Sequence, residues 1–208
     1  MPESAFDRPP MRERTIGGYL DMLGSSDPTP GAGSAAGLLG ALGASLGLMV
    51  ISLTSSEDEG TSRTLDTARE SLVRLRDRFT TLAEADERVF QGYRDAADMP
   101  KGTPEEKRAR KAAMQEALKQ AASVPLKACE TAVELARTIV PVQEHGNPFL
   151  LSDAQVAMLY AATCFEASRV NVNVNLAMIN DDAWITEVAN HIQSLAADLR
   201  ATSARVNP

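Results

Sequence analysis

The sequence predicts an all-α protein, an antiparallel bundle of five to six helices. Aromatic residues make up only 4% of the 208 residues, alanine and leucine are abundant, and runs of β-branched residues are nearly absent, which favours packed helices over sheets. Apolar residues recur at steps of three and four through most of the chain, and short loops separate these stretches. A chain of this length can form one domain with a substantial core.

The composition also restricts the partners and the compartment. The net charge of −7 comes without a cluster of lysine and arginine, so we expect no nucleic-acid surface. Cys129 and Cys164 stand far apart and no signal sequence opens the chain, which predicts a cytoplasmic protein. We expect no metal site, because His145 and His191 lack a ligand-like spacing to Cys, Asp or Glu.

The first elements lead into a proline- and glycine-rich loop. Residues 1–14 are polar and show no period, and we interpret them as a mobile tail before a helical domain over 15–208. Thr15 is expected to cap a short helix. The loop follows over 26–34, and Ser34 is a candidate N-cap for the uncharged run to residue 56. The N–H groups at that helix start suit an anion or a developing negative charge.

The uncharged run over 31–56 approaches the length of a membrane span. It lacks flanking basic residues and aromatic anchors and ends in the acidic segment 57–59, so we interpret it as a central core helix and expect no membrane association. Its glycines weaken a helix unless another helix approaches closely, either within the bundle or across a dimer axis.

The next helix, predicted over 61–98, contains one polar residue where the period calls for an apolar one. The apolar series from Leu72 to Tyr93 passes through Asp86. A carboxylate at such a position is costly to ionise, so its pKa should be raised or it must face a polar cavity. A core carboxylate satisfied by a helix cap or an asparagine explains the pattern equally well.

Two further helices have distinct signals. Thr103-Pro104-Glu105-Glu106 is a capping box with proline at the first helical position, and it starts a helix that we expect to end by Pro141. Pro125 lies in its middle, where it removes one helical hydrogen bond, should bend the helix and can free a carbonyl towards a cavity. Ser152 with Gln155 predicts a second capping box.

The helix after residue 152 carries two neighbouring rows. We expect the apolar row to face the core, and it contains Val156, Tyr160, Thr163, Ala167, Val170, Val174 and Met178. A polar row lies beside it and contains Cys164, Ser168, Asn171 and Asn175. Two asparagines one turn apart are typical of a hydrogen-bonding ladder between helices. The last helix is predicted to begin near Asp181 or Asp182.

Several motifs, taken in order from about residue 16 to residue 205, resemble the cyclodeaminase/cyclohydrolase family. This family includes the C-terminal half of formiminotransferase-cyclodeaminase and stand-alone methenyltetrahydrofolate cyclohydrolases. The motifs are Pro28-Thr29-Pro30-Gly31-Ala32-Gly33-Ser34, Pro100-Lys101-Gly102-Thr103-Pro104-Glu105-Glu106-Lys107 with Arg110, Ser123-Val124-Pro125-Leu126, Gly146-Asn147, Ser152-Asp153 and Asn171-Val172-Asn173-Val174-Asn175-Leu176.

The resemblance implies a homodimer with a folate cleft near its interface and a tetrahydrofolate derivative as the substrate. The implied reaction is either closure of 5-formimino-tetrahydrofolate to 5,10-methenyl-tetrahydrofolate with loss of ammonia, or hydrolysis of the methenyl form to 10-formyl-tetrahydrofolate. The family's catalytic aspartate falls on Asp86. The implied substrate-binding residues are Pro30, Gly31, Gly33, Ser34, Lys101, Arg110, Asn147, Asp153, Asn171 and Asn175.

The chemistry gives these residues distinct expected roles. Ring closure takes a proton from N10 and delivers one to the departing amine, and a single carboxyl of raised pKa can do both in turn. The loop N–H groups would hold a pterin or carboxylate edge, the two asparagines would orient the ring system, and Lys101 or Arg110 would pair with the glutamate tail.

Two departures from the family pattern keep alternatives open. Ala32 stands where the family usually has a third glycine, and the segment Glu57-Asp58-Glu59 replaces glycine and a basic pair found in many relatives. Acidic residues there would repel a polyglutamate tail. A family member acting on a non-folate ring-closing substrate, or a non-catalytic helical dimer that binds a ligand or partner, therefore stands beside the folate enzyme as a second hypothesis.

Overall fold

The computed structural model describes residues 8–205, and every regular element in that range is a helix. The prediction of an all-α bundle of five to six helices is confirmed for these residues. The elements are η1 (Met11–Glu13), α1 (Ile16–Leu23), α2 (Ala32–Ser52), α3 (Glu59–Ala97), α4 (Pro104–His145), η2 (Pro148–Leu150), α5 (Leu151–Leu176) and α6 (Asp182–Ser203).

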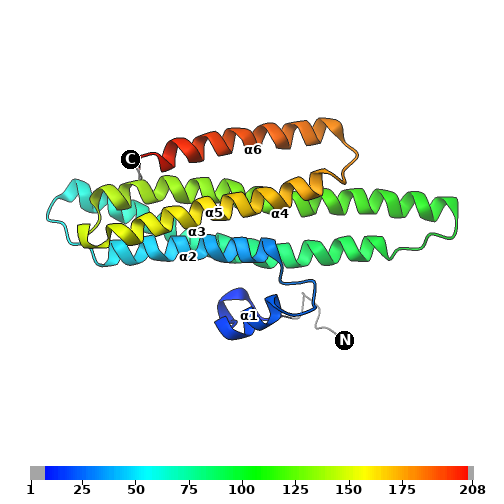
Figure 1. Ribbon diagram of the computed structural model, residues 1–208, viewed down its shortest axis with the longest axis horizontal. Helices are drawn as coiled ribbons and strands as arrows, with labels where there is room; N and C mark the ends of the chain where they lie inside the picture. The colour runs from blue at the N-terminus through cyan, green and yellow to red at the C-terminus, as the bar shows by residue number, and fades with distance from the viewer. Residues whose placement is uncertain (1–7, 206–208) are drawn as a thin grey trace.

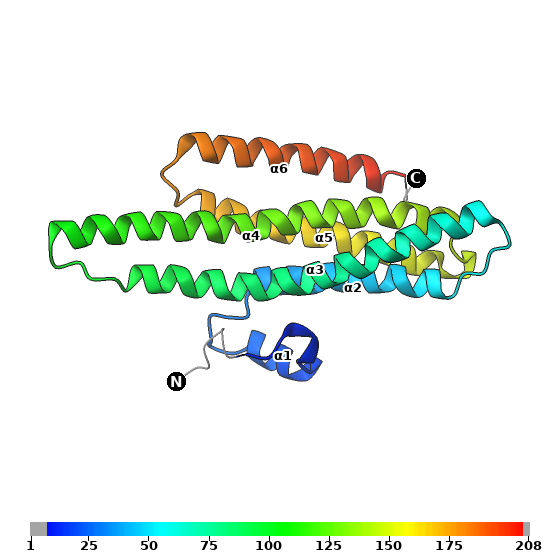
Figure 2. The same ribbon diagram turned by 180° about the vertical axis from the view of Figure 1, so that it is seen from behind.

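Helices α2 to α5 form an antiparallel four-helix core. Helix α2 packs against α3 and α5, and α4 packs against the same two helices from the other side. Helix α6 lies along the outside of α4, whereas α1 lies on the opposite side of the bundle (Figure 1). Seen from behind, α3 and α4 extend as a hairpin beyond the start of α2 (Figure 2).

Close packing of α2 explains its glycines. A Cβ on Gly40 would overlap the ring of Phe79, and one on Gly47 would overlap Ile139 and Leu72. The close approach expected from the sequence therefore occurs within the bundle. By length and composition α2 is the one helix among residues 8–205 that could cross a membrane, and in this fold it lies against α3, α4 and α5.

Some predicted boundaries hold and others are wrong. Thr103 and Glu106 form the predicted capping box, and Asp181 caps α6. Helix α4 does not end by Pro141 but continues to residue 145, because a proline near a helix end costs only one hydrogen bond. Ser152 caps nothing, since α5 begins one residue earlier, directly after η2.

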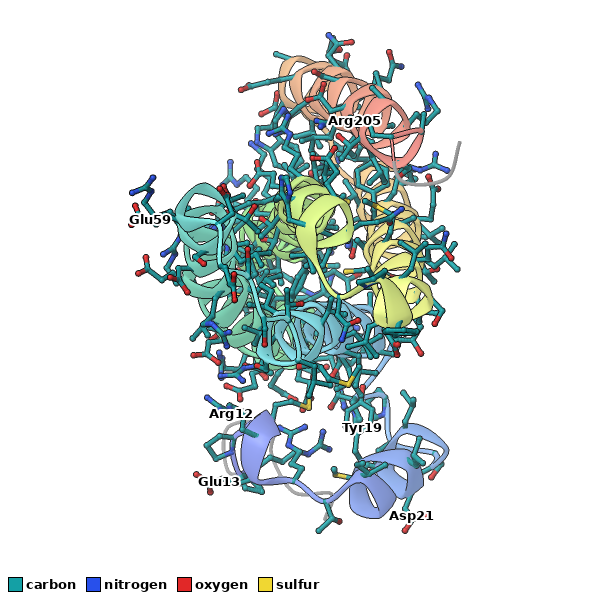
Figure 3. All side chains as sticks on the ribbon, turned by 90° about the vertical axis from the view of Figure 1, so that its left-hand side faces the viewer. Arg12, Glu13, Tyr19, Asp21, Glu59 and Arg205 are labelled. Atoms are coloured by element: carbon teal, nitrogen blue, oxygen red, sulfur yellow. The ribbon has the colours of Figure 1, made fainter. Side chains whose placement is uncertain are left out.

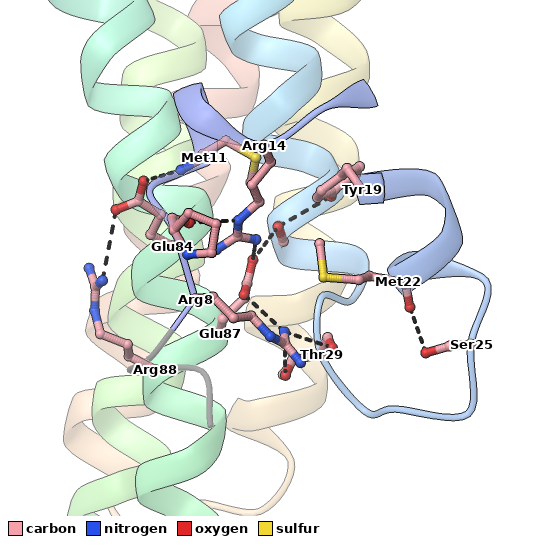
Figure 4. Close-up of polar contacts among 12 residues, drawn as sticks. Arg8, Met11, Arg14, Tyr19, Met22, Ser25, Thr29, Glu84, Glu87 and Arg88 are labelled. Carbon is pink, nitrogen blue, oxygen red and sulfur yellow. Dashed lines mark hydrogen bonds and ion pairs between the residues drawn. The ribbon is translucent and has the colours of Figure 1, made fainter. Parts of the chain in front are cut away.

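Residues 8–14, the described part of the expected mobile tail over 1–14, lie in contact with the helical bundle. Residues 11–13 form a 3₁₀ turn, and Met11 is buried. The backbone N–H of Met11 donates to Glu84 at 2.6 Å, and two arginines of this segment are bound to α3 (Figure 4). Residues 1–7 lie outside the described residues. The three arginines of the segment pair with carboxylates of α3, which explains why the segment is mostly polar.

Helix α5 buries part of the polar row instead of the apolar row that was expected to face the core. Cys164 and Ser168 of the polar row are 0% and 1% exposed, whereas Val170 and Val174 of the apolar row are 57% and 58% exposed. The small side chains of the polar row let α5 approach its neighbours closely, and the period alone does not distinguish two adjacent rows. The C-terminal half of the apolar row is consequently left on the surface, where Val170, Val174 and Met178 are exposed.

Candidate active site

The start of α2 is capped by a side chain from another helix. Gly31, the residue before the helix, has no side chain that could cap it. The backbone N–H of Ser34 instead donates a hydrogen bond to the carboxylate of Asp86 on α3. The carboxylate of Asp86 therefore lies at the start of α2, where free N–H groups and the positive end of the helix dipole favour a negative charge. This is the place that the sequence predicted to suit an anion.

Three influences set the proton affinity of Asp86. Burial raises the pKa of this carboxyl to about 6, the hydrogen bond from the Ser34 N–H opposes the rise, and the Glu87 carboxylate adds to it. A carboxyl with this pKa is partly protonated near neutral pH. It can therefore accept a proton in one step and return it in the next.

Gly33 is required by the position of Asp86. A Cβ on residue 33 would overlap the carboxyl group, so that any larger side chain would displace either Asp86 or the first turn of α2. The glycine thus allows the carboxyl to lie directly on the helix start.

A cavity of about 320 Å³ opens beside this carboxyl, a volume within the range of ligand pockets. The loop before α2 forms its floor, the α3–α4 hairpin forms one wall, and the end of α5 forms the other. Asp86 is the one charged residue among those that line it. The lining residues are Pro28, Thr29, Gly31, Ala32, Gly33, Asp86, Val89, Phe90, Tyr93, Leu118, Ala121, Asn171, Val174, Asn175 and Met178.

The carbonyl freed by Pro125 lies at this cavity. Proline has no N–H, so the Ala121 carbonyl one turn earlier loses its helical donor. Asn175 replaces that donor: its Nδ2 donates to Ala121 O at 3.1 Å and to Asn171 O at 3.0 Å. Both hydrogens of the Asn175 amide are then used, which leaves its oxygen as the polar atom that can meet a ligand.

Asn171 carries a complementary polar atom. Its Nδ2 is buried and has no hydrogen-bond partner among the described residues. A buried donor without an acceptor lowers the stability of the fold. Because Asn171 lines the cavity, a ligand there can supply the acceptor. The two asparagines therefore present one donor and one acceptor to the same space.

The link between Pro125 and Asn175 is testable by a double-mutant cycle. Asn175→Ala should lower the free energy of unfolding by about 1–2 kcal/mol, because the Ala121 carbonyl loses its donor. In a Pro125→Ala background residue 125 supplies the helical N–H, so the same substitution should cost less than about 0.5 kcal/mol. Denaturant unfolding of the four proteins measures the coupling. Equal costs in the two backgrounds would contradict the proposed compensation.

Other predicted site residues lie apart from the cavity or have structural partners. Pro30 and Ser34 belong to the loop and the first turn of α2 but do not line the cavity. Lys101 is exposed in the turn between α3 and α4. Arg110 donates to the Ala97 carbonyl at 2.7 Å, which caps the end of α3. Its expected role towards a glutamate tail therefore competes with a structural one.

Asn147 and Asp153 lie at the other end of the bundle. Asn147 Nδ2 donates to Leu53 O at 2.9 Å, and its backbone N–H donates to Thr54 Oγ1 at 2.8 Å. These contacts fasten the turn before α5 to the end of α2. Since α2 has 21 residues, this end is about 30 Å from Asp86. Within one chain these two residues do not reach the cavity.

Sequence reasoning missed the fully buried carboxylate of the region, Glu87. Its side chain is 1% exposed and forms ion pairs with Arg8 and Arg14. Ser34 Oγ donates to Glu87 Oε1 at 3.2 Å, and Tyr19 OH donates to Ser34 Oγ at 3.2 Å. In Figure 3 Tyr19 points from α1 towards the bundle, whereas Asp21 on the same helix points away. The steps of four from Phe79 through Ala83 to Glu87 could have indicated this position.

Fold and site together define an all-α protein with a buried carboxyl of raised pKa at a ligand-sized cavity. Among residues 8–205, no group of three or more His, Cys, Asp or Glu side chains is placed to hold a metal ion. Residues 15–194 match the profile of the formiminotransferase-cyclodeaminase family. The chain belongs to this family.

Individual relatives cover nearly the whole chain. A methenyltetrahydrofolate cyclohydrolase of Methylorubrum extorquens is 38% identical over 92% of this chain and 93% of its own length. The formimidoyltransferase-cyclodeaminase of Sus scrofa is 34% identical over 99% of this chain, which spans only 37% of that protein. The crystal structure of a formiminotetrahydrofolate cyclodeaminase from Thermotoga maritima superimposes with a TM-score of 0.85, at 25% identity and with 94% of each chain covered.

Proposed function

We propose that this protein is a folate one-carbon enzyme that hydrolyses 5,10-methenyl-tetrahydrofolate to 10-formyl-tetrahydrofolate, with Asp86 as its acid–base group. The position of Asp86 carries the proposal: a carboxyl whose pKa is raised by burial to about 6 lies at the wall of a cavity of about 320 Å³. Similarity to a cyclohydrolase over 93% of that enzyme's length supports this choice of reaction.

The hydrolysis needs one group that moves a proton twice. Asp86, in its ionised form, takes a proton from water as the water oxygen bonds to the methenyl carbon, which gives a neutral carbinolamine. The bond from that carbon to N5 then breaks, Asp86 returns its proton to N5, and the hydroxyl proton leaves as the formyl C=O forms. One water is consumed and one proton is released. A carboxyl with a pKa near neutrality suits both transfers.

A second candidate reaction is the closure of 5-formimino-tetrahydrofolate with loss of ammonia. The similarity to the Thermotoga maritima cyclodeaminase favours it. Here N10 bonds to the formimino carbon, Asp86 takes the N10 proton, and it then protonates the amine that leaves. Both reactions pass through a tetrahedral carbon between N5 and N10, so one carboxyl serves either of them.

The shape of the cavity suits the ring end of a folate. Phe90 and Tyr93 line it and offer aromatic surfaces to a flat ring system, while Asn171 and Asn175 supply a donor and an acceptor. The glutamate tail would extend outside. The acidic segment 57–59 joins α2 to α3 at the opposite end of α2, so within one chain it does not face the cavity and does not repel the tail.

The function is tested with the purified protein and each folate in turn, by following the methenyl absorbance. Hydrolysis predicts a decay of 5,10-methenyl-tetrahydrofolate that is faster than without protein, and cyclodeamination predicts growth of the signal from 5-formimino-tetrahydrofolate. No change with either substrate, from a folded protein, would overturn the proposal in favour of a ligand-binding or non-folate role.

We also propose that the protein is a homodimer formed through α2 and α5. Leu42 of α2 and Leu53, the residue directly after α2, are 44% and 58% exposed, and Leu159 and Val170 of the neighbouring α5 are 55% and 57% exposed. The two helices pack side by side, so these residues form one apolar face. Such faces mark interfaces between proteins. Val174 belongs both to this face and to the cavity lining, so the partner would border the cleft.

The dimer is tested by the mass in solution. Sedimentation equilibrium should give twice the chain mass of 22.2 kDa. The double variant Leu42→Glu/Val170→Glu should give the single mass, because two buried charges oppose association. The matched control Thr64→Glu, at an exposed position of α3, should stay dimeric. A wild-type protein that sediments as a monomer at micromolar concentration would contradict the proposal.

A further inference from the structure

The segment 8–14 places two buried arginines around one carboxylate. The side chains of Arg8 and Arg14 are each 4% exposed, and that of Glu87 is 1% exposed. Arg14 Nη1 lies 2.7 Å from Glu87 Oε1, and Arg8 Nη1 lies 3.2 Å from Glu87 Oε2. Figure 4 shows both guanidinium groups converging on this carboxylate. The segment precedes the part of the chain that matches the family, residues 15–194.

This ion cluster is connected to both ends of the loop that forms the cavity floor. Arg8 Nη1 donates to Thr29 O at 2.8 Å and to Thr29 Oγ1 at 3.2 Å. Glu87 Oε1 accepts from Ser34 Oγ at 3.2 Å. Thr29 lines the cavity, and the N–H of Ser34 donates to Asp86. The cluster thus holds the first and the last residue of the stretch 29–34.

Stability alone is a weak reason for such a cluster. Buried ion pairs stabilise a fold little more than well-packed apolar residues do, because each charge must leave water. What a buried pair with defined hydrogen bonds does supply is geometry, since the planar guanidinium fixes the direction of its partners. Here those partners are the loop backbone and the helix start that touches Asp86.

We propose that residues 8–14 are a strap that positions the active-site loop. In this arrangement Arg8 and Arg14 act through Glu87, Thr29 and Ser34 to hold the stretch 29–34 against Asp86. They are positioning residues, because neither arginine lines the cavity. The effect on turnover rests on the proposed function, whereas the effect on the loop does not.

The strap also affects the charge balance around Asp86. The groups that face this carboxyl are the Ser34 N–H from α2, Glu87 on its own helix and the Tyr19 phenol from α1. The cavity lining from α4 and α5 contains no charged residue. Removing an arginine leaves the Glu87 charge unbalanced and should move the acid limb of kcat/KM to higher pH. Glu87→Gln removes that charge and should move the limb to lower pH. General destabilisation would not produce opposite shifts.

The test compares Arg14→Gln and Arg8→Gln with the matched control Arg12→Gln. Arg12 lies in the same segment, but its side chain is 59% exposed and pairs with the exposed Asp77. Hydrogen exchange of the amides over 29–36, measured without substrate, should become at least about tenfold faster in the first two variants. Their kcat/KM should fall at least about tenfold, with the acid limb moved upward. The control should remain within about twofold of the wild type.

Each outcome has a defined meaning. Folded Arg14→Gln and Arg8→Gln proteins with unchanged loop exchange and an unchanged pH profile would overturn the strap. If Arg14→Gln does not fold, Arg14→Lys keeps the charge but loses the planar fork, and unchanged exchange and pH profile in that variant would also overturn it. Faster loop exchange in a protein whose wild type turns over neither folate would support the strap and reject the proposed function.

Discussion

Asp86→Asn is expected to lower kcat by about 10²–10⁴-fold while the protein keeps its fold. The amide has the shape of the carboxyl, and its oxygen still accepts the Ser34 N–H, but it cannot exchange a proton. In the wild type, kcat/KM should rise with pH and reach half its plateau near pH 6, because the pKa of Asp86 is about 6 and its ionised form takes the first proton. The remaining activity of the variant should lack this limb.

The same substitution should make the protein more stable at neutral pH. The pKa of Asp86 is raised from 3.8 to about 6 by burial, so the folded chain binds this proton more tightly than the unfolded chain. Its stabilising contribution is fully present below pH 3.8 and is lost as the pH rises through 6. Two pH units correspond to about 3 kcal/mol, and Asn avoids this penalty.

Denaturant unfolding at two pH values checks this prediction. Asp86→Asn should raise the free energy of unfolding by about 1–3 kcal/mol at pH 8 and by much less at pH 4. Asp66→Asn, at an exposed aspartate of the same helix, is the control and should change little. Full turnover in Asp86→Asn would remove the basis of the assigned mechanism.

Gly33→Ala is expected to produce the second largest loss. The added Cβ would overlap the Asp86 carboxyl, so the carboxyl must leave the start of α2 or the first helical turn must move. Displacing a reacting group by about 1 Å can cost about 100-fold in rate, and we expect kcat/KM to fall by at least that factor. Overpacking should also lower the free energy of unfolding by about 1–3 kcal/mol.

Gly92→Ala provides the matched control for this prediction. Gly92 is an exposed residue of α3, and a Cβ there meets nothing within 4 Å. This variant should keep its activity and gain about 0.5–1 kcal/mol of stability, because alanine favours a helix over glycine. Steady-state kinetics and thermal unfolding of both variants separate the two effects. Wild-type kcat/KM in Gly33→Ala would show that the position of the carboxyl is not critical.

The sequence predicted the helices and part of the site, because both depend on local patterns. The capping box at Thr103 and the apolar period of α3 are short-range signals, and the same period singled out Asp86. The freed carbonyl expected from Pro125 was found at the cavity, with Asn175 as its new donor. That pairing joins residues 54 positions apart, which no local pattern reveals.

The parts that could not be predicted depend on tertiary contacts. Arg8 and Arg14 were assigned to a mobile tail, because a polar segment without period gives no sign that its partner is a buried carboxylate 73 or more residues away. On α5, two adjacent rows fit the helical period equally well, and packing of small side chains selected the polar one for the core. The catalytic role implied for Asp86 and the binding roles implied for the other site residues all stay predictions.

Helix α2 contains no ionisable side chain over its 21 residues. The favourable potential that its first turn presents to Asp86 therefore arises from peptide dipoles alone. Substituting side chains along α2 can change how tightly it fits between its neighbours, but it cannot reverse the sign of that potential. Substitutions in the loop before α2 would therefore leave the helix start favourable for a negative charge. The same substitutions would change which ligands fit the cavity.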